Sequence, residues 1–302
     1  MSAGYDDSTV DRLDYHASML TDRVRIEAFM RAITVVVEPG DVVVDIGTGT
    51  GVLAMFAAKA GARAVYAIEQ GPIIDVARQM VAANGYEDRV RLISGTSTEV
   101  ELPELGDVLI TETIGVAALD EGILGWVSDA RSRLLKPGAT IIPSRLALLA
   151  AALELPRGAA ETARWTRPMH SLDFTPMHRL LINQLSWDEL SPVSVVSEPV
   201  EVFTTDFTEQ PADLKALVRS VARRDATVHA IGLWFAAEVG PGIGLSNAPP
   251  SPVPSWNQGV LMLEQPVTVG VGEAVTIEIR VTSDGRSWSW RIVDAPLQST
   301  PL

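Results

Sequence analysis

Apolar residues in the first half of the chain fall in short runs that alternate with segments of helical periodicity. We expect strands at about 41–46, 64–69, 90–94, 107–112 and 139–142, and helices at about 52–60, 73–83 and 121–135. Strands that alternate with helices are typical of βαβ units in a parallel sheet. Gly61, Gly85 and Lys136-Pro137-Gly138 follow the three helices, as residues that end helices do. Ahead of the sheet, residues 8–37 predict one or two further helices.

The pattern changes after Pro143, where helical periodicity gives way to apolar runs typical of strands. These runs span 146–155, 198–207, 227–239, 260–263, 274–281 and 287–293. Asp284-Gly285 lies between the last two runs and is a strong signal for a hairpin turn. Residues 211–223 fit a helix or a strand, and the five prolines of Pro241–Pro254 predict a loop.

These patterns divide the chain into an α/β part and a mostly antiparallel β part. We expect N-terminal helices over residues 1–38, a Rossmann-like α/β domain over 39–143 and a β domain over 144–302. A chain of 302 residues is long enough for one large domain or two modest ones.

Composition narrows the class of protein. A hydrophobic content of 47% and a charged content of 21% are typical of soluble globular proteins. The formal net charge of −14 repels nucleic acid and acidic membranes and attracts cationic substrates. The absence of cysteine excludes disulfides and thiolate nucleophiles, and the four histidines show no metal-ligand spacing. Because the N-terminus is polar and no apolar stretch could span a bilayer, we expect a cytoplasmic enzyme without a metal.

The most informative segment is Asp45-Ile46-Gly47-Thr48-Gly49-Thr50-Gly51, which joins the first predicted strand to the first helix. A strand, a Gly-rich turn and a helix form the nucleotide-sized crevice of an open α/β sheet. Glu69 ends the second strand, roughly where an acid would meet ribose hydroxyls. The G-x-G-x-G spacing differs from that of dinucleotide sites. It favours S-adenosylmethionine (SAM), which has no phosphate to place at the helix N-terminus.

A second group of residues, Thr111-Glu112-Thr113-Ile114-Gly115 and Glu121, follows the fourth predicted strand. Open α/β sheets bind ligands at this edge. A guanidinium stays protonated at ordinary pH, so a nitrogen lone pair is scarce. Two carboxylates can draw the positive charge toward two nitrogens and align the third with a methyl donor. Acids also favour helix N-termini, which is a purely structural alternative for Glu121.

The chain resembles the protein arginine methyltransferases from His16 to Val293, and three segments carry the resemblance. They are the Gly-rich segment that runs from Asp45 to Ala62, the segment His16-Ala-Ser-Met-Leu-Thr-Asp-Arg-Val-Arg25, and the two glutamates nine residues apart. The resemblance implies a Rossmann-like SAM domain followed by a β-barrel, and a homodimer formed through an arm at about 157–190. It also implies that S-adenosylhomocysteine is the product.

The resemblance also assigns roles to residues ahead of the sheet. It implies that the helix of His16 and Met19 closes over the cofactor. Arg25 on the same segment would bind the methionine carboxylate, for which a guanidinium is suited because it can donate two parallel hydrogen bonds. The family's adenine-contacting glutamate falls on Thr98, and the adjacent Glu99 could replace it after a shift of one residue.

Several positions depart from the family pattern on the acceptor side. The family's Thr-His-Trp loop is Pro254-Ser255-Trp256 here, so Ser255 and Trp256 are expected to border the acceptor. Asp22 is retained without the histidine that pairs with it in the family. The family's aromatic residues are replaced at Asp6, Asp7, Val10, Thr113 and Val116. These differences indicate a divergent member that acts on something other than arginine in a histone-like peptide.

Three functions remain open at this point. The first is methyl transfer from SAM to a nitrogen of a guanidine or amine, carried by arginine, a peptide or a natural product. The second is O- or N-methylation of a neutral small molecule, for which Glu121→Gln would be tolerated. The third is a non-catalytic SAM-binding scaffold, although such a protein has no reason to keep two mutually repelling carboxylates together.

Overall fold

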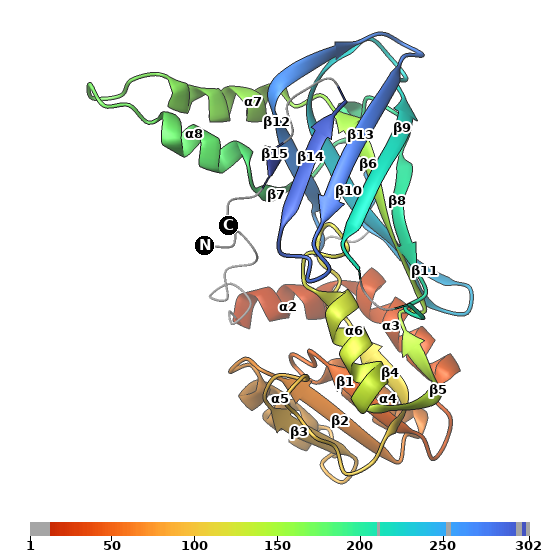
Figure 1. Cartoon of the computed structure of the whole chain (residues 1–302). Helices are drawn as coiled ribbons and strands as arrows, with labels where there is room; N and C mark the ends of the chain where they lie inside the picture. Colours follow the sequence, from red (N-terminus) through yellow and green to blue (C-terminus); the bar gives the residue numbers. More distant parts are fainter. Residues whose placement is uncertain (1–12, 210–211, 252–254, 294–297, 300–302) are drawn as a thin grey trace.

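The computed structural model describes residues 13–209, 212–251, 255–293 and 298–299. Two helices, α2 (Leu13–Thr21) and α3 (Arg23–Val36), precede a parallel sheet, and antiparallel sheets follow it (Figure 1). The expected limits at 38/39 and 143/144 fall in the short connections on either side of the parallel sheet. Within the described residues, no helix combines the length and apolar character needed to cross a membrane.

The parallel sheet has five strands in the order β3-β2-β1-β4-β5. Its elements are β1 (Val42–Ile46), α4 (Val52–Ala60), β2 (Ala64–Glu69), α5 (Ile74–Ala83), β3 (Val90–Ser94), β4 (Gly106–Thr111), α6 (Ile123–Arg133) and β5 (Leu135–Ile142). All five residues of β1 are buried, as expected of a central strand covered on both faces. Ile46 of β1 pairs with Ile68 of β2 and with Thr111 of β4. The Gly-rich turn, Glu69 and Glu112 therefore lie at one edge of the sheet.

The helix expected at 121–135 is shorter than predicted. It spans Ile123–Arg133, and Lys136-Pro137-Gly138 belongs to β5 instead of ending the helix. β5 lies at the edge of the sheet, where a proline without an N–H is tolerated. Its pairing with β4 shifts in register between Gly106 and Val108, so the irregular residues fall where the ladder is interrupted.

The second half of the chain forms two antiparallel sheets. A six-stranded sheet has the order β7-β12-β10-β6-β8, with β11 paired to β10, and a four-stranded sheet has the order β15-β14-β13-β9. Their strands are β6 (Arg145–Leu153), β7 (Leu185–Asp188), β8 (Val200–Thr205), β9 (Leu214–Val221), β10 (Ala226–Gly240), β11 (Ile243–Ser246), β12 (Gln258–Val269), β13 (Ala274–Val281), β14 (Trp288–Ile292) and β15 (Gln298–Ser299). Across the described residues, these strands make two sheets and not the closed barrel that the resemblance implied.

Two other expectations for this half need correction. The ambiguous segment 211–223 contains strand β9, in which Ala216 and Ser220 point inward with the two-residue period of a sheet. The segment Pro241–Pro254, expected to be loop, contains β11, which folds back on the end of β10 through a turn at Gly242 with a φ of 68°. Proline is absent from β11 itself, so its ladder can form.

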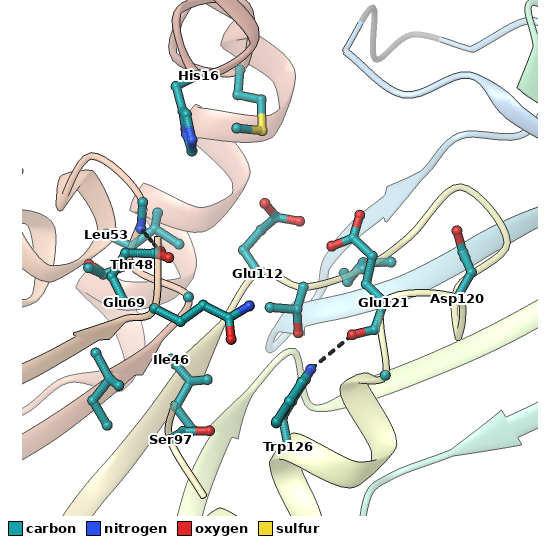
Figure 2. Close-up of a pocket in the computed structure, with 18 of the residues that line it drawn as sticks. His16, Ile46, Thr48, Leu53, Glu69, Ser97, Glu112, Asp120, Glu121 and Trp126 are labelled. Carbon is teal, nitrogen blue, oxygen red and sulfur yellow. Dashed lines mark hydrogen bonds between the residues drawn. The ribbon is translucent and has the colours of Figure 1, made fainter. Parts of the chain in front are cut away.

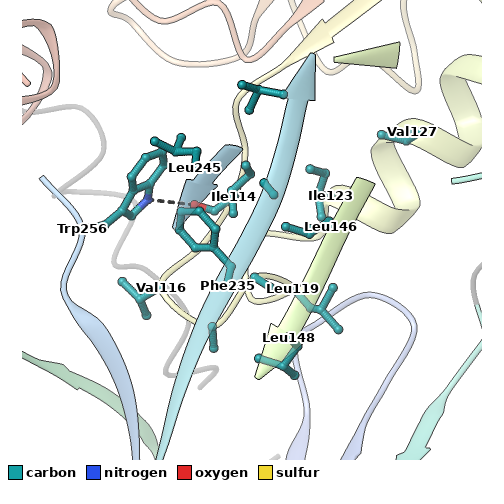
Figure 3. Close-up of a cluster of buried hydrophobic side chains, with 14 of the residues drawn as sticks. Ile114, Val116, Leu119, Ile123, Val127, Leu146, Leu148, Phe235, Leu245 and Trp256 are labelled. Atoms are coloured by element: carbon teal, nitrogen blue, oxygen red, sulfur yellow. Dashed lines mark hydrogen bonds between the residues drawn. The ribbon is translucent and has the colours of Figure 1, made fainter. Parts of the chain in front are cut away.

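The N-terminal helix α3 joins the two halves of the molecule. It packs against α4 and also against β10 and β11. A Cβ atom on Gly240 would lie 2.9 Å from the Cβ atom of Ala32, so this contact brings helix and strand backbones close together. The loop after β4 also enters the β domain, where Ile114, Val116 and Leu119 pack with Phe235 (Figure 3). The two halves consequently share one hydrophobic core.

A helical arm extends from the six-stranded sheet (Figure 1). It contains α7 (Pro156–Ala163), a 3₁₀ turn (Arg164–Thr166) and α8 (Thr175–Ile182), and it returns to the sheet at β7. Its exposed large apolar side chains are Leu172, Met177, Leu180 and, on β7, Trp187. This arm coincides with the segment of about 157–190 for which a role in dimerisation was expected.

Candidate active site

The Gly-rich turn after β1 follows a path that requires glycine. Gly47, Gly49 and Gly51 have φ angles of 71°, 54° and 80°, a region that side-chain-bearing residues rarely adopt. A Cβ atom on Gly49 would lie 3.4 Å from the ring of His16, which places this turn directly beneath α2. The turn therefore exposes backbone to the cavity between α2 and the sheet, as a cradle for a small ligand does.

Two acids stabilise the turn. Asp45 is fully buried and accepts a hydrogen bond from the Thr48 hydroxyl at 2.5 Å. Burial raises the pKa of Asp45 to about 7, and the nearby Glu69 carboxylate adds to the shift. Glu69, at the end of β2, accepts from the N–H of Gly49 at 2.9 Å and from that of Gly71 at 2.8 Å. Its carboxylate is thus fixed at the wall of the cavity.

Helix α2 and the loop after β3 complete the cofactor end of the cavity. His16, which is only 6% exposed, and Met19 line it from α2, and Thr98 lines it from the opposite side. Glu99 is exposed and is not among the lining residues. Of the two residues considered for contact with adenine, Thr98 therefore borders the cavity and Glu99 does not.

Glu112 and Glu121 lie on the two sides of a hairpin-like loop between β4 and α6. Figure 2 shows their carboxyl ends pointing to the same side of this loop, toward the helix that carries His16. The loop is held by hydrogen bonds from the Ala117 N–H to Asp120 at 2.8 Å and from the Trp126 indole to the Glu121 carbonyl at 2.8 Å. Two carboxylates thus share the cavity with the Gly-rich turn.

Arg25 reaches the same cavity and makes a contact that the sequence did not reveal. Its guanidinium forms an ion pair with the Glu112 carboxylate, and the two side chains are only 10% and 9% exposed. It also lies over the Trp256 ring, with its Cζ atom 4.3 Å from the ring centroid. A guanidinium between an aromatic face and a carboxylate has little freedom to move.

Trp256 is buried and contacts both the loop of Glu112 and strand β10 of the β domain. It is 4% exposed and donates from its indole N–H to the carbonyl of Ile114, in the loop of Glu112, at 3.0 Å. Its ring also contacts Phe235 of β10 edge-on, with centroids 5.0 Å apart. Trp256 does line the cavity, but mainly beneath Arg25 and the loop of Glu112.

Ser255 does not line the cavity and is hydrogen-bonded to Asp22 instead. The Ser255 hydroxyl donates to the Asp22 carboxylate at 2.5 Å, and the Ser255 N–H donates to the same oxygen at 3.0 Å. The other carboxylate oxygen caps α3 by accepting from the Arg25 N–H at 3.1 Å. The histidine that pairs with this aspartate in the family is absent, and Ser255 is hydrogen-bonded to Asp22 in its place, because the serine hydroxyl and N–H both reach the carboxylate.

Three further features were missed by sequence reasoning. Asp120 lines the cavity beside Glu121, and burial raises its pKa to about 6. Trp126 supports Glu121 from α6. The turn Asp284-Gly285-Arg286 between β13 and β14 forms the far wall. Its hairpin character was predicted, but its position beside Glu121 depends on how the two halves pack.

The cavity that these residues enclose has a volume of about 860 Å³. It runs from the Gly-rich turn and Glu69 past Glu112 and Glu121 to the β13–β14 turn. Glycines with positive φ, a fixed acid at the end of β2 and a buried arginine suit a ligand with an adenosine and an amino-acid carboxylate. The residues present fit SAM at one end and a cationic acceptor at the other.

Comparisons with known proteins agree with this geometry. Residues 148–292 match the family model of the arginine methyltransferase oligomerization subdomain, and residues 27–146 match that of a ribosomal protein methyltransferase. The chain is 32% identical over 282 residues to protein arginine N-methyltransferase 6 of Danio rerio. That alignment covers 88% of this chain and 79% of the relative. It is also 32% identical over 287 residues to an arginine N(omega)-methyltransferase of Streptomyces achromogenes subsp. streptozoticus. This second alignment covers 88% of this chain and 75% of that relative.

A solved structure extends the similarity to the whole fold. The chain superimposes on one chain of the Trypanosoma brucei PRMT1 enzyme–prozyme heterotetrameric complex with AdoHcy, with a TM-score of 0.84 and 26% identity. The match covers 96% of this chain and 98% of that one. The fold and the site together define a methyltransferase that uses SAM as its methyl donor. The chain belongs to the protein arginine methyltransferase family.

Proposed function

We propose that this methyltransferase transfers the methyl group to a guanidine nitrogen, with Glu112 and Glu121 as the catalytic pair. The observation that supports this most directly is the position of both carboxylates in the cavity of the Gly-rich turn, on a loop braced from both halves of the molecule. SAM supplies an electrophilic methyl group on a sulfonium. The protein must then orient the acceptor nitrogen and stabilise the charge that develops on the acceptor.

Glu112 and Glu121 have complementary roles in this proposal. A guanidinium between them places two of its nitrogens against carboxylates, and the positive charge is drawn toward these nitrogens. The third nitrogen then retains more lone-pair character and is directed along the cavity toward the methyl donor. Arg25 beside Glu112 limits the motion of that carboxylate, so the pair is preorganised before the acceptor arrives.

The residues around the Gly-rich turn are proposed to hold the donor. Glu69 would bind the ribose hydroxyls, and Thr98 would border the adenine. His16 and Met19 would cover the donor from α2, and Arg25 would bind its carboxylate. The positive φ angles of the three glycines support close backbone approach. Trp256 and Ser255 are assigned a supporting role instead of acceptor contact, because one is buried and the other is turned to Asp22.

The acceptor assignment is tested by methyl transfer from labelled SAM to three groups of compounds. These are free arginine with an arginine-rich peptide, a panel of primary amines, and a panel of phenols and carboxylates. We expect transfer to guanidines, and we expect it to be lost in both Glu112→Gln and Glu121→Gln while S-adenosylhomocysteine (SAH) binding persists. Transfer restricted to neutral acceptors, or an active Glu121→Gln variant, would refute the proposal.

The protein is also proposed to act as a homodimer through the helical arm. Exposed Leu172, Met177 and Leu180 give the arm an apolar surface of the kind enriched in interface cores. Analytical ultracentrifugation should show a dimer that dissociates in Leu180→Glu. The control Val271→Glu changes an apolar residue that is at least as exposed, in a turn outside the arm, and should leave the dimer intact. A monomeric wild-type chain would refute this assignment. A cytoplasmic location stays a prediction.

A further inference from the structure

The far wall of the cavity is formed by the turn between β13 and β14. A Cβ atom on Gly285 would overlap the carbonyl oxygen of Leu119 and would lie 3.5 Å from the Cα atom of Asp120. A Cβ atom on Gly122 would lie 3.4 Å from the carbonyl oxygen of Asp284. The β13–β14 turn is therefore seated backbone against backbone on the loop that carries Glu121.

The turn has a defined conformation. The Asp284 carboxylate accepts from the Thr282 hydroxyl at 2.5 Å and from the Arg286 N–H at 3.0 Å. These bonds hold the pKa of Asp284 below its usual range. The indole of Trp288, which is 2% exposed, donates to the Gly285 carbonyl at 2.8 Å. The backbone of Arg286 is thus fixed, and its side chain is exposed at the cavity wall.

The two arginines of the cavity differ in their surroundings. Five carboxylates line it, on Glu69, Glu112, Asp120, Glu121 and Asp284. Two arginines line it among the described residues, Arg25 and Arg286. Arg25 is buried against Glu112 and Trp256 at the donor side. Arg286 is exposed instead, in the turn that is seated on the loop of Glu121. The carboxylate of the neighbouring Asp284 accepts from the Thr282 hydroxyl and from the Arg286 backbone N–H.

From this arrangement we infer that Arg286 is a specificity residue that binds a carboxylate on the acceptor. This inference rests on the proposed guanidine methylation. An acceptor with a guanidinium at one end and a carboxylate at the other matches the two glutamates and Arg286 together. Free arginine and related guanidino acids have this charge pattern. An arginine inside a peptide has an amide in place of the carboxylate, and a basic peptide brings further positive charge toward Arg286.

Three acceptors test the inference: L-arginine, L-argininamide and an arginine-rich peptide, each measured as kcat/KM with saturating SAM. Argininamide keeps the guanidinium and loses only the carboxylate. We expect the wild-type chain to prefer arginine over argininamide by about tenfold or more, the size of one charge-assisted contact. Arg286→Gln should lower kcat/KM for arginine to the argininamide level and leave argininamide unchanged. Arg286→Lys should restore part of the preference.

Controls separate this role from a structural one. Arg219→Gln removes an exposed arginine of the same sheet and should leave the preference intact. SAH affinity should be the same in Arg286→Gln and the wild-type chain. An equal loss for arginine and argininamide in Arg286→Gln would overturn the inference, as would a wild-type preference for argininamide or for the peptide. Failure of every guanidine acceptor would instead refute the proposed function on which the inference rests.

Discussion

The ion pair between Arg25 and Glu112 leads to a prediction about Glu112→Gln. Both side chains are nearly buried, and the same arginine is proposed to bind the donor carboxylate. Glu112 and that carboxylate therefore compete for one guanidinium. Glutamine keeps the shape and one acceptor oxygen of Glu112 but removes its charge, so Arg25 becomes more available to the donor.

The expected magnitude follows from the loss of charge at one hydrogen-bond acceptor. A hydrogen bond to a charged group contributes about 1.5–3 kcal/mol and a neutral one about 1 kcal/mol, so the competing contact weakens by about 1 kcal/mol. SAH should then bind Glu112→Gln about fivefold more tightly than it binds the wild-type chain. SAM should gain less, because Glu112 also attracts the sulfonium. Methyl transfer should fall by about 10²–10³, as on removal of one preorganised charge-stabilising group.

Isothermal titration with SAH and SAM, combined with a labelled-methyl assay, measures all three effects. Glu104→Gln is a suitable control, because Glu104 pairs with Arg63 at the surface outside the cavity. That variant should keep the affinities and the rate of the wild-type chain. A tenfold weaker affinity of Glu112→Gln for SAH would refute the reasoning, since it would mean that Glu112 assists Arg25 in binding the donor.

Three further predictions concern the residues that support the site. Ser255→Ala should lower the free energy of unfolding by about 1.5 kcal/mol, because a buried carboxylate loses one of its donors; unchanged denaturant stability would contradict this. Asp45 has a folded pKa of about 7, above the unfolded value of 3.8, so its folded form holds the proton more tightly and stability falls as pH rises through this window. Asp45→Asn should remove that fall between about pH 4 and pH 7, and parallel pH profiles of the two chains would argue against it. Glu69→Ala should weaken SAH binding at least tenfold by titration, and equal affinity would exclude its ribose role.

The cofactor side of the fold could be predicted from sequence because its determinants are local. The Gly-rich turn joins a buried strand to a helix, and the periodicity of both elements is visible within about 20 residues. The parallel sheet then brings Glu69 and Glu112 to one edge. Glu112 and Glu121 could be paired in advance because both follow the same strand. The predicted helix at 121–135 was too long, because the pairing of β5 with β4 decides where α6 ends and the sequence does not show this pairing.

The acceptor side could not be predicted in the same way, because its contacts join distant segments. Asp22 and Ser255 are 233 positions apart and meet only when α3 packs beside the β domain. The resemblance drew attention to a missing histidine and concealed that a serine could reach the same carboxylate. Arg286 gave no signal at all, since its importance depends on a turn seated against the loop of Glu121.

The central claim is that this chain methylates a guanidine nitrogen through two carboxylates. Single-turnover transfer from methyl-labelled SAM to free L-arginine, compared between the wild-type chain and Glu121→Gln, tests it most directly. The account predicts labelled methylarginine with the wild-type chain and a rate at least 10²-fold lower with the variant, whose SAH affinity stays the same. Equal rates in the two chains, or label only on a neutral acceptor, would contradict it.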